Sequence, residues 1–392
     1  MDYCNNRIIC DLKYKNTKYN FVDVLAIKLI LSQIIQFLHI KDIKSLSLCN
    51  KKINKSYWSQ IKQLKISENS EILTIKNLIN KCNNLIQLNL RFCKKIEDYS
   101  YISKLEKLEI LDLSNTNVFD ISFLEKNKNI KELYLEDCNI ENFIPLSKLY
   151  RLEILELCNT NVSHISFLEN NKKIKELNLE YCEDIEDFNP IFNLEKLERL
   201  ILFNTNISNI LFLEKNKNVE ELDLGLCDNI TDFSPISKLE KLEILSICNT
   251  NISDISFLEK NKNIRELNLN FCKNIKDFTP ISKLEKLEIL TLIRTSISDI
   301  SFLDKNKNIK KLDLEDCKNI KDFTPVSKLE KLEILKLRNT NVSDISFLEN
   351  NKNIQELDLI ECWNIGDFTY INKLINKNNN IKVLYNSQYY CQ

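Results

Sequence analysis

The chain has 392 residues and a formal net charge of −1, and it contains only two glycines and two histidines. So few glycines exclude Gly-rich phosphate-binding loops, and His39 and His164 alone leave little room for acid–base or zinc chemistry. A charge so close to zero gives no general attraction to nucleic acid or to an anionic membrane. We therefore expect a non-enzymatic protein that uses no cofactor or metal.

Residues 1–20 are predicted to be an irregular lead-in. They begin MDYCNNRIIC, without the charged and then apolar pattern of a secretory signal. Fourteen cysteines without such a signal point to a reducing compartment. No apolar run reaches the ~18 residues that span a membrane. The expected location is the cytoplasm, or that of the host cell for a viral chain.

Residues 21–60 are predicted to form a small helical module, because their apolar residues recur at helical spacing. The stretch ILSQIIQFLHIKDIKSLSLCNKKINKSYW (30–58) resembles an F-box through I-I-x-F-L, Asp42-Ile43, the L-S-L-C-N-K run and Trp58. Ala26-Ile27 stands where that family has Leu-Pro. The resemblance implies that an apolar set forms the core of the module or docks on a Skp-type adaptor of a cullin ubiquitin ligase. That set is Ile34, Ile35, Phe37, Leu38, Ile43, Leu46 and Leu48.

The same helices have a second interpretation that is compatible with the first. A solenoid needs a terminal element that shields its first repeat from water. Residues 21–60 are therefore predicted to be an F-box-like module or a simple N-terminal cap.

Residues 61–375 are predicted to be one repeat array. Thirteen clear copies of 22 or 23 residues begin at Leu85, and a worn copy begins at Ile61. Two unit types alternate, one with Thr after the L-x-x-L-x-L segment (Leu108 to Thr116) and one with Cys (Val219 to Cys227). Such regular self-similarity means a solenoid whose units bury their apolar faces against each other. Residues 376–392, with a last fragment at Ile381, are predicted to be a C-terminal cap.

Each L-x-x-L-x-L segment alternates apolar and polar residues, which predicts a short strand with one buried face. The return path is too short for a long helix and predicts turns of 3₁₀ type. It carries D-I-S-F-L in Thr-type units and D-F-x-P in Cys-type units, so we expect two stacked columns of phenylalanine. Asp120, Asp254, Asp299 and Asp344 are expected to cap the return turns by accepting backbone N–H bonds.

These patterns resemble leucine-rich repeats. CDNITDFSPISKLEKLEIL (227–245) is similar to the cysteine-containing subclass common in F-box proteins. NTNISDISFLEK (249–260) is similar to the 22-residue type of bacterial adhesins and phosphatase regulators. The predicted fold is thus α/β: a curved parallel sheet with short 3₁₀ return segments, preceded by the helical module.

The recurring cysteines form a column at intervals of 44 or 45 residues, from Cys93 to Cys362. Members two units apart lie ~9.6 Å apart at ~4.8 Å per strand. A disulfide needs Cα atoms within roughly 7 Å, so these cysteines cannot pair with each other. The intervening threonines also argue against metal binding. We expect each thiol and hydroxyl to satisfy backbone groups. Cys158 and Cys248, two residues before a Thr, are expected to be exposed.

The outward face of the sheet is the predicted binding surface. Its strand positions carry thirteen acids and five bases over thirteen units, with rows of isoleucine between the acids. Such a face suits a protein with basic and apolar groups and opposes nucleic acid. The alternative is a solvated face that only maintains solubility. The candidate residues are Glu132, Glu136, Ile154, Glu176, Glu180, Glu221, Asp223, Ile244, Glu266, Ile289, Asp313 and Glu315.

The F-box resemblance implies a substrate-recognition subunit of an SCF-type ubiquitin ligase, whose adaptor binds the N-terminal module and whose target binds the repeats. The alternative from the residues alone is a stand-alone repeat scaffold with capping helices. Both predict protein partners, no nucleic acid and no membrane, and a chain that is monomeric on its own.

Overall fold

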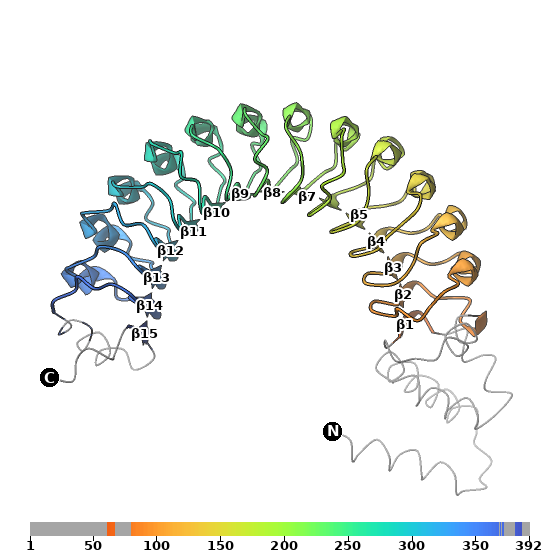
Figure 1. Cartoon of the computed structure of the whole chain (residues 1–392), viewed down its shortest axis with the longest axis horizontal. Coiled ribbons are helices and arrows are strands. Elements are labelled where there is room, and N and C mark those ends of the chain that lie inside the picture. Colours follow the sequence, from red (N-terminus) through yellow and green to blue (C-terminus); the bar gives the residue numbers. More distant parts are fainter. Residues whose placement is uncertain (1–60, 67–79, 368, 370, 372–380, 386–392) are drawn as a thin grey trace, which may run out of the picture.

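The computed structural model describes residues 61–66, 80–367, 369, 371 and 381–385. These residues form one sheet of 15 parallel strands whose spatial order is their order in the chain. The array bends into an arc, with the strands along its inner side and short helices along its outer side (Figure 1). The structure therefore has the predicted curved solenoid.

Every strand has three residues, and adjacent strands are joined through 3₁₀ helices along most of the array. The strands are β1 Gln63–Lys65, β2 Gln87–Asn89, β3 Ile110–Asp112, β4 Glu132–Tyr134, β5 Ile154–Glu156, β6 Glu176–Asn178, β7 Arg199–Ile201, β8 Glu221–Asp223, β9 Ile244–Ser246, β10 Glu266–Asn268, β11 Ile289–Thr291, β12 Lys311–Asp313, β13 Ile334–Lys336, β14 Glu356–Asp358 and β15 Lys382–Leu384. The 3₁₀ helices are η1 Ser100–Lys104, η2 Ser122–Lys126, η3 Ile144–Lys148, η4 Ser166–Asn170, η5 Asn189–Asn193, η6 Leu211–Glu214, η7 Ser234–Lys238, η8 Ser256–Lys260, η9 Thr279–Lys283, η10 Ser301–Lys305, η11 Thr324–Lys328 and η12 Ser346–Asn350.

Leucine columns hold the strands in register. The middle residue of each strand pairs with the middle residue of the next, as in Leu200 with Leu222 and Leu222 with Leu245. These leucines are buried, whereas the residues on either side of them are mostly half-buried. A shift by one residue would turn every leucine outward, so burial fixes the register. The fragments at residues 61 and 381 also supply strands, β1 and β15.

Phenylalanines of the two columns are buried behind the sheet, and at two places along the array a ring of one column stacks on a ring of the other. Phe143 of a Cys-type unit stacks on Phe167 of the next Thr-type unit, with ring centroids 6.4 Å apart. Phe323 and Phe347 repeat this pairing at 6.1 Å. These spacings exceed the ~4.8 Å between neighbouring strands. The back of the array is therefore wider than the sheet, which bends the sheet inward as Figure 1 shows.

Aspartates start the return turns as the sequence predicts. Asp254 accepts the backbone N–H of Ser256 at 2.8 Å, and Asp299 does the same for Ser301. Each lies one residue before the N-cap and makes an Asx turn. In Cys-type units a proline occupies the first turn of the helix, as in η7, where its missing N–H has no bond to lose.

The Cys–Thr column is a hydrogen-bond ladder. Six carbonyls, those of Leu113, Leu157, Leu202, Ile247, Leu292 and Leu337, each accept a Thr hydroxyl at 2.7–2.9 Å and the next Cys thiol at 2.9–3.2 Å. All cysteines in the described residues are free. The prediction that this column satisfies backbone groups is confirmed.

A second ladder was not predicted. In each K-N-K segment or its variant, one asparagine is completely or almost completely buried: Asn127, Asn171, Asn216, Asn261, Asn306 and Asn351. Its Nδ2 donates to two carbonyls of the preceding unit at 2.8–3.2 Å. The exposed lysines around the asparagine make the segment resemble solvated surface, so the sequence did not reveal its burial. The asparagines nevertheless recur at the same interval as the threonines of the Cys–Thr column.

The predicted N-terminal module at 21–60, and most of the predicted C-terminal cap at 376–392, lie outside the described residues. Within the described part, no helix is long and apolar enough to cross a membrane.

Candidate functional site

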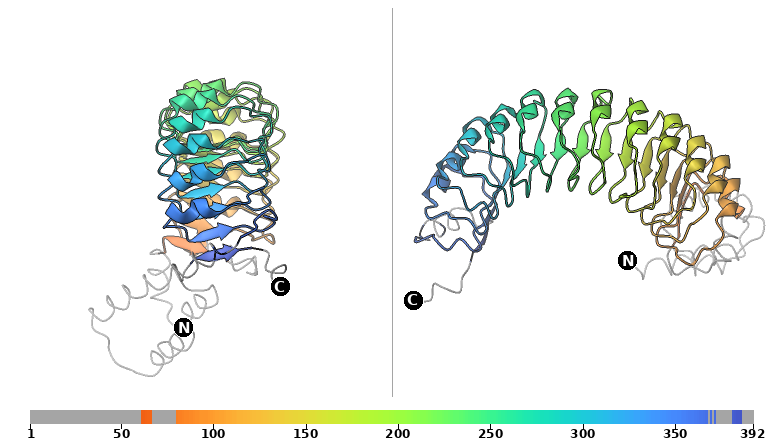
Figure 2. Two further views of the ribbon diagram at one scale, coloured as in Figure 1. Left: turned by 90° about the vertical axis from the view of Figure 1, so that its left-hand side faces the viewer. Right: turned by 45° about the horizontal axis from the view of Figure 1, so that its top comes forward.

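The candidate site is the concave face of the sheet. Three positions in each unit face it: the first and third residues of each strand and the residue two places later. Figure 2 shows these strands side by side along the inner side of the arc. Because strands stack in register, the three positions form three columns along the arc. We call them the first, second and third face columns.

The structure places all the predicted face residues on these columns. Glu132, Ile154, Glu176 and Ile244 belong to the first column and are half-buried, as the pleat requires. Asp313 is the exception, because it is only 3% exposed. It accepts the N–H of Glu315 at 3.2 Å and lies 3.8 Å from the ammonium of Lys336. Its carboxylate therefore contacts its own sheet, and little of it is accessible to a partner.

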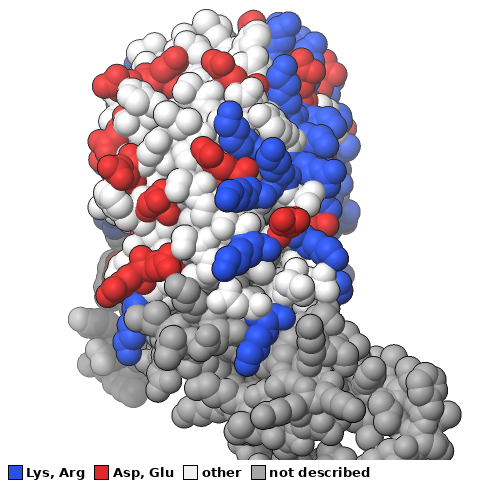
Figure 3. All heavy atoms as spheres, turned by 90° about the vertical axis from the view of Figure 1, so that its right-hand side faces the viewer, with Lys and Arg blue, Asp and Glu red and all other residues white. Residues whose placement is uncertain are grey.

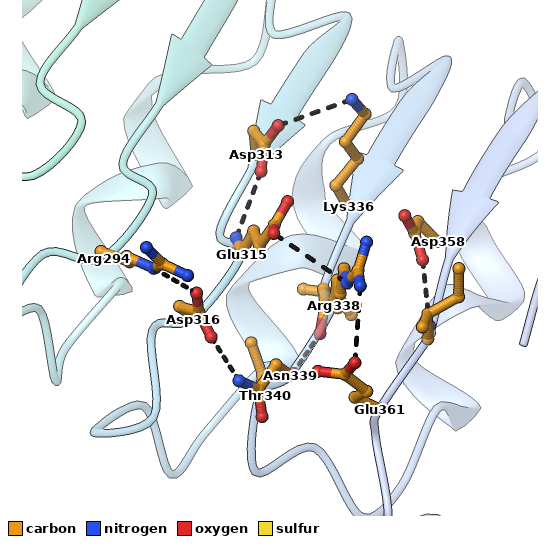
Figure 4. Close-up of polar contacts among 12 residues, drawn as sticks. Arg294, Asp313, Glu315, Asp316, Lys336, Arg338, Asn339, Thr340, Asp358 and Glu361 are labelled. Atoms are coloured by element: carbon orange, nitrogen blue, oxygen red, sulfur yellow. Dashed lines mark hydrogen bonds and ion pairs between the residues drawn. The ribbon is translucent and has the colours of Figure 1, made fainter. Parts of the chain in front are cut away.

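Ion pairs neutralise the acids toward the C-terminal end of the face. Arg338 lies between Glu315 at 4.0 Å and Glu361 at 3.4 Å, and Lys336 faces Asp313 (Figure 4). Lys382 lies 3.3 Å from Glu356. These acids already have cationic neighbours, so this end offers little free negative charge to a partner.

The middle of the face is different. Five acids on β4 to β10 or just after them make no ion pair with any described residue: Glu132, Glu176, Glu180, Asp223 and Glu266. The only base among the face columns of β4 to β10 is Arg199, which pairs with Glu221 at 3.0 Å and Glu156 at 3.5 Å. We call these five residues the uncompensated acids.

The proton affinities of this region follow from burial and from the lack of bases. Burial raises the pKa of Asp223, and the neighbouring Glu221 adds to the rise. Burial also raises the pKa of Glu180, with Asp223 as the next cause. The pKa of Glu156 is raised by burial as well, although Arg199 opposes the shift. These carboxylates hold their charge at a cost that a cationic partner would reduce.

Basic residues gather elsewhere. Figure 3, a view onto the N-terminal end of the array, shows Lys and Arg along one flank and most Asp and Glu on the opposite flank. Lysines of the turns that precede the strands are exposed, for example Lys107 and Lys128. A charged partner would therefore meet a different potential on the two flanks of the array.

Sequence analysis missed a fourth set, the residue directly after the third face column. It has positive φ in all thirteen units from Phe92 to Glu361. In Thr-type units it is Asn, which suits this left-handed conformation, and the one exception is Arg294. In Cys-type units it varies and includes Tyr181, Leu226 and Phe271, for which positive φ costs about 1 kcal/mol. Its varied chemistry hides a constant backbone conformation.

Cys158 and Cys248 lie in the third face column and are half-buried, not exposed as predicted. Burial raises the pKa of the Cys158 thiol to about 12, and Glu180 contributes to the rise. Burial also raises the pKa of Cys248. Both thiols are therefore protonated near neutral pH and are poor nucleophiles. In the described part of the chain, no group of three His, Cys, Asp or Glu residues could hold a metal ion.

The predicted adaptor-binding residues form no part of this surface. Ile34, Ile35, Phe37, Leu38, Ile43, Leu46 and Leu48 all lie outside the described residues, so their role stays a prediction.

Comparison with known proteins supports the fold. A family model for leucine-rich repeats, in two copies, matches residues 240–283. No curated protein sequence matches the chain. Among solved structures, internalin InlF of Listeria monocytogenes is 21% identical with a TM-score of 0.69, covering 88% of this chain and 93% of its own.

Two further solved structures are similar. A leucine-rich-repeat protein of Leptospira interrogans is 19% identical with a TM-score of 0.66, covering 84% of this chain and 91% of its own. The functional domain of InlJ from Listeria monocytogenes, described as including a cysteine ladder, is 18% identical with a TM-score of 0.61, covering 84% and 74%. The chain therefore carries leucine-rich repeats arranged as in these proteins.

Proposed function

We propose that the chain is a protein-binding scaffold whose concave face captures a partner with cationic and apolar groups. The observation that carries the proposal is the set of uncompensated acids on β4 to β10. Half-buried isoleucines of the first face column, such as Ile154 and Ile244, lie between them. Carboxylates whose pKa burial has raised gain most from a cation that arrives with its own apolar neighbours.

A basic peptide tests the proposal without knowledge of the natural partner. The probe is a fluorescent extended peptide in which lysine alternates with serine, titrated into the full chain at low and at physiological salt. We expect saturable binding that weakens with salt, and a loss of about tenfold in Glu176→Lys/Glu180→Lys.

The matched control is Glu259→Lys/Glu285→Lys, which makes the same charge change at two exposed positions of the return segments. It should retain most of the binding. Equal losses in both double variants would show that only net charge matters, and the concave face would then have no special role.

The finer proposal is that this scaffold is the substrate receptor of an SCF-type ubiquitin ligase. It rests on the F-box resemblance of residues 30–58 alone. The test is co-purification of the full chain with a Skp-type adaptor. Capture should be lost in Phe37→Glu and Leu48→Glu and kept in Phe119→Glu, which changes an exposed residue of the array. An intact chain that captures no adaptor would exclude the ligase role and leave the stand-alone scaffold.

A further inference from the structure

The repeats differ most clearly at the third face column of β7 and β8. The third face column of the Thr-type units holds Ser114, Cys158, Cys248, Ile293 and Arg338, and only the unit of β7 has an aromatic residue there, Phe203. The next unit has Gly225, the only glycine among residues 80–365. Near-identical units do not show which part of the face is used, so such a paired departure is informative.

Phe203 and Gly225 fit each other. A Cβ built on Gly225 would lie 2.7 Å from Cδ2 of Phe203 and 2.7 Å from Sγ of Cys248, closer than real contacts allow. The glycine thus lets the ring lie over the backbone that follows β8. Tyr181 closes the other side, with its ring edge-on to Phe203 and the centroids 5.6 Å apart. Phe203 nevertheless stays half-buried and Tyr181 is 43% exposed.

Three neighbours continue this apolar zone at positions of unfavourable backbone geometry. Tyr181, Leu226 and Phe271 have φ of 58°, 59° and 63°, and each is exposed or half-buried. The Thr-type units between them use Asn204 and Asn249 at this position. Large apolar side chains here neither fill the core nor ease the turn. Tyr181 packs on Phe203, and the guanidinium of Arg294 lies over the ring of Phe271, 5.5 Å from its centroid, but part of each side chain stays accessible. Backbone strain held at accessible apolar residues is typical of binding sites. We call Tyr181, Phe203, Leu226 and Phe271 the aromatic edge.

The charge next to the aromatic edge selects its partner. On β6 to β11 the three face columns carry five acids and one base, Arg199, a balance of 1 − 5 = −4. The acids are Glu176, Glu180, Glu221, Asp223 and Glu266. Arg199 is already paired with Glu221. The aromatic edge lies beside uncompensated acids. It is therefore complementary to a segment that carries basic residues together with a large aromatic or aliphatic side chain.

We propose that the aromatic edge is a docking subsite for a large apolar side chain of a basic peptide segment in a protein partner, whose lysines or arginines lie over the acids of β6 to β10. The subsite rests on the proposed function of the concave face and gives it a position. The apolar side chain packs against Phe203 between Tyr181 and Leu226. The cations meet Glu176, Glu180 and Asp223.

The test compares three short extended peptides on the full chain: lysine alternating with serine, the same peptide with one central tryptophan, and the tryptophan peptide with glutamate in place of lysine. The tryptophan–lysine peptide should bind about tenfold more tightly than the lysine–serine peptide. Phe203→Cys, which installs the residue that neighbouring Thr-type units carry, should abolish that difference and leave the lysine–serine affinity unchanged.

Matched variants separate docking from folding. Leu226→Asp and Phe92→Asp both install the residue that other Cys-type units carry, at Asp137 and Asp316. Phe92 has the same positive φ and is exposed, but it lies at β2, far from the edge. Both variants should fold, with unchanged or higher unfolding midpoints. Only Leu226→Asp should lose the tryptophan-dependent gain.

The outcomes distinguish the two proposals. If the lysine–serine peptide binds and the tryptophan–lysine peptide binds no more tightly, the aromatic edge is not a docking subsite. The proposed role of the uncompensated acids would then remain. A tryptophan–glutamate peptide that binds as well as the lysine version would overturn the basic partner. A gain from tryptophan that Phe203→Cys and Phe92→Asp affect equally would also overturn the subsite.

Discussion

At the scale of the residue, side chains supply the hydrogen-bond donors that buried backbone carbonyls of the array need. The carbonyl of Leu202 lies where the chain leaves the strand. It receives the hydroxyl of Thr205 at 2.9 Å and the thiol of Cys227 at 3.1 Å. Two donors from adjacent units thus converge on one buried acceptor. A buried carbonyl without a donor costs about 1–3 kcal/mol, which explains why both columns repeat without interruption.

A double-mutant cycle measures this convergence. Cys227→Ala and Thr205→Val each leave one donor on Leu202, so each should lower the free energy of unfolding by about 1 kcal/mol. The double variant removes both donors and should lose about 1 kcal/mol more than the sum of the single changes. Urea unfolding of the four proteins checks the coupling. Strict additivity would mean that the two donors act independently.

The charge of Asp223 gives a pH-dependent prediction. Burial raises its pKa, so the folded chain holds the proton more firmly than the unfolded chain and loses stability as pH rises through the folded pKa. Asp223→Asn keeps an acceptor for the N–H of Gly225, as Asn178 and Asn268 do for their own turns. The variant should be more stable than the native chain at neutral pH. The gain should vanish below the ordinary Asp pKa of about 3.9.

Asp322 provides the control of opposite sign. Hydrogen bonds from Thr324 lower its pKa, so its charge favours folding. Asp322→Asn should give no stabilisation at neutral pH. Urea midpoints at neutral pH and at about pH 3, below the ordinary Asp pKa, compare the two variants. A neutral-pH gain in both would point to relief of general charge and not to the burial of Asp223.

At the scale of the element, each 3₁₀ return segment is tied to its neighbour by one buried asparagine. Asn306 donates to the carbonyls of Ile281 and Leu284 at 2.9 and 3.0 Å. Its own Oδ1 is buried without a partner in the described residues. The amide group is therefore used as a double donor, a role that neither leucine nor aspartate can fill.

Substitution of Asn306 tests this role. Asn306→Ala should lower the free energy of unfolding by about 2 kcal/mol through two lost hydrogen bonds. Asn306→Asp should cost more, because it buries a carboxylate against two carbonyls. The control Asn308→Ala changes a less buried asparagine in the same turn and should stay within about 0.5 kcal/mol. Thermal and urea unfolding of the three variants rank these costs.

At the scale of the whole molecule, the periodicity of the leucines predicts the architecture but not every contact that holds it together. The leucine spacing predicts every strand from β2 to β14 and both fragments at the ends, because alternation determines which residues a strand buries. It could not predict the buried asparagines, whose lysine neighbours resemble surface, or the positive φ beside the face, which many residue types occupy. The register makes Phe203 and Gly225 neighbours, but only the structure shows that the Phe203 ring lies over Gly225.

The Cys–Thr alternation also predicts which length changes the array tolerates. Deletion of residues 264–308 removes β10 and β11 and joins Asn263 to Ile309, where the native chain has Asn263 before Ile264. Every remaining Thr then still precedes a Cys-type unit, so the ladder stays continuous. Because units contact mainly their neighbours, the shortened chain should unfold cooperatively, with a urea m-value reduced in proportion to the surface removed.

Deletion of residues 264–286 removes one unit and joins Asn263 to Leu287, which places two Thr-type units side by side. The carbonyl of Ile247 keeps the hydroxyl of Thr250 but loses the thiol of Cys272, its second donor. Phe278, a buried member of the Cys-type phenylalanine column, is also lost with the unit. The smaller deletion should therefore be the more destabilising one per residue removed. If both shortened chains unfold at the same urea concentration, the single unit and not the Cys–Thr pair is the true structural repeat.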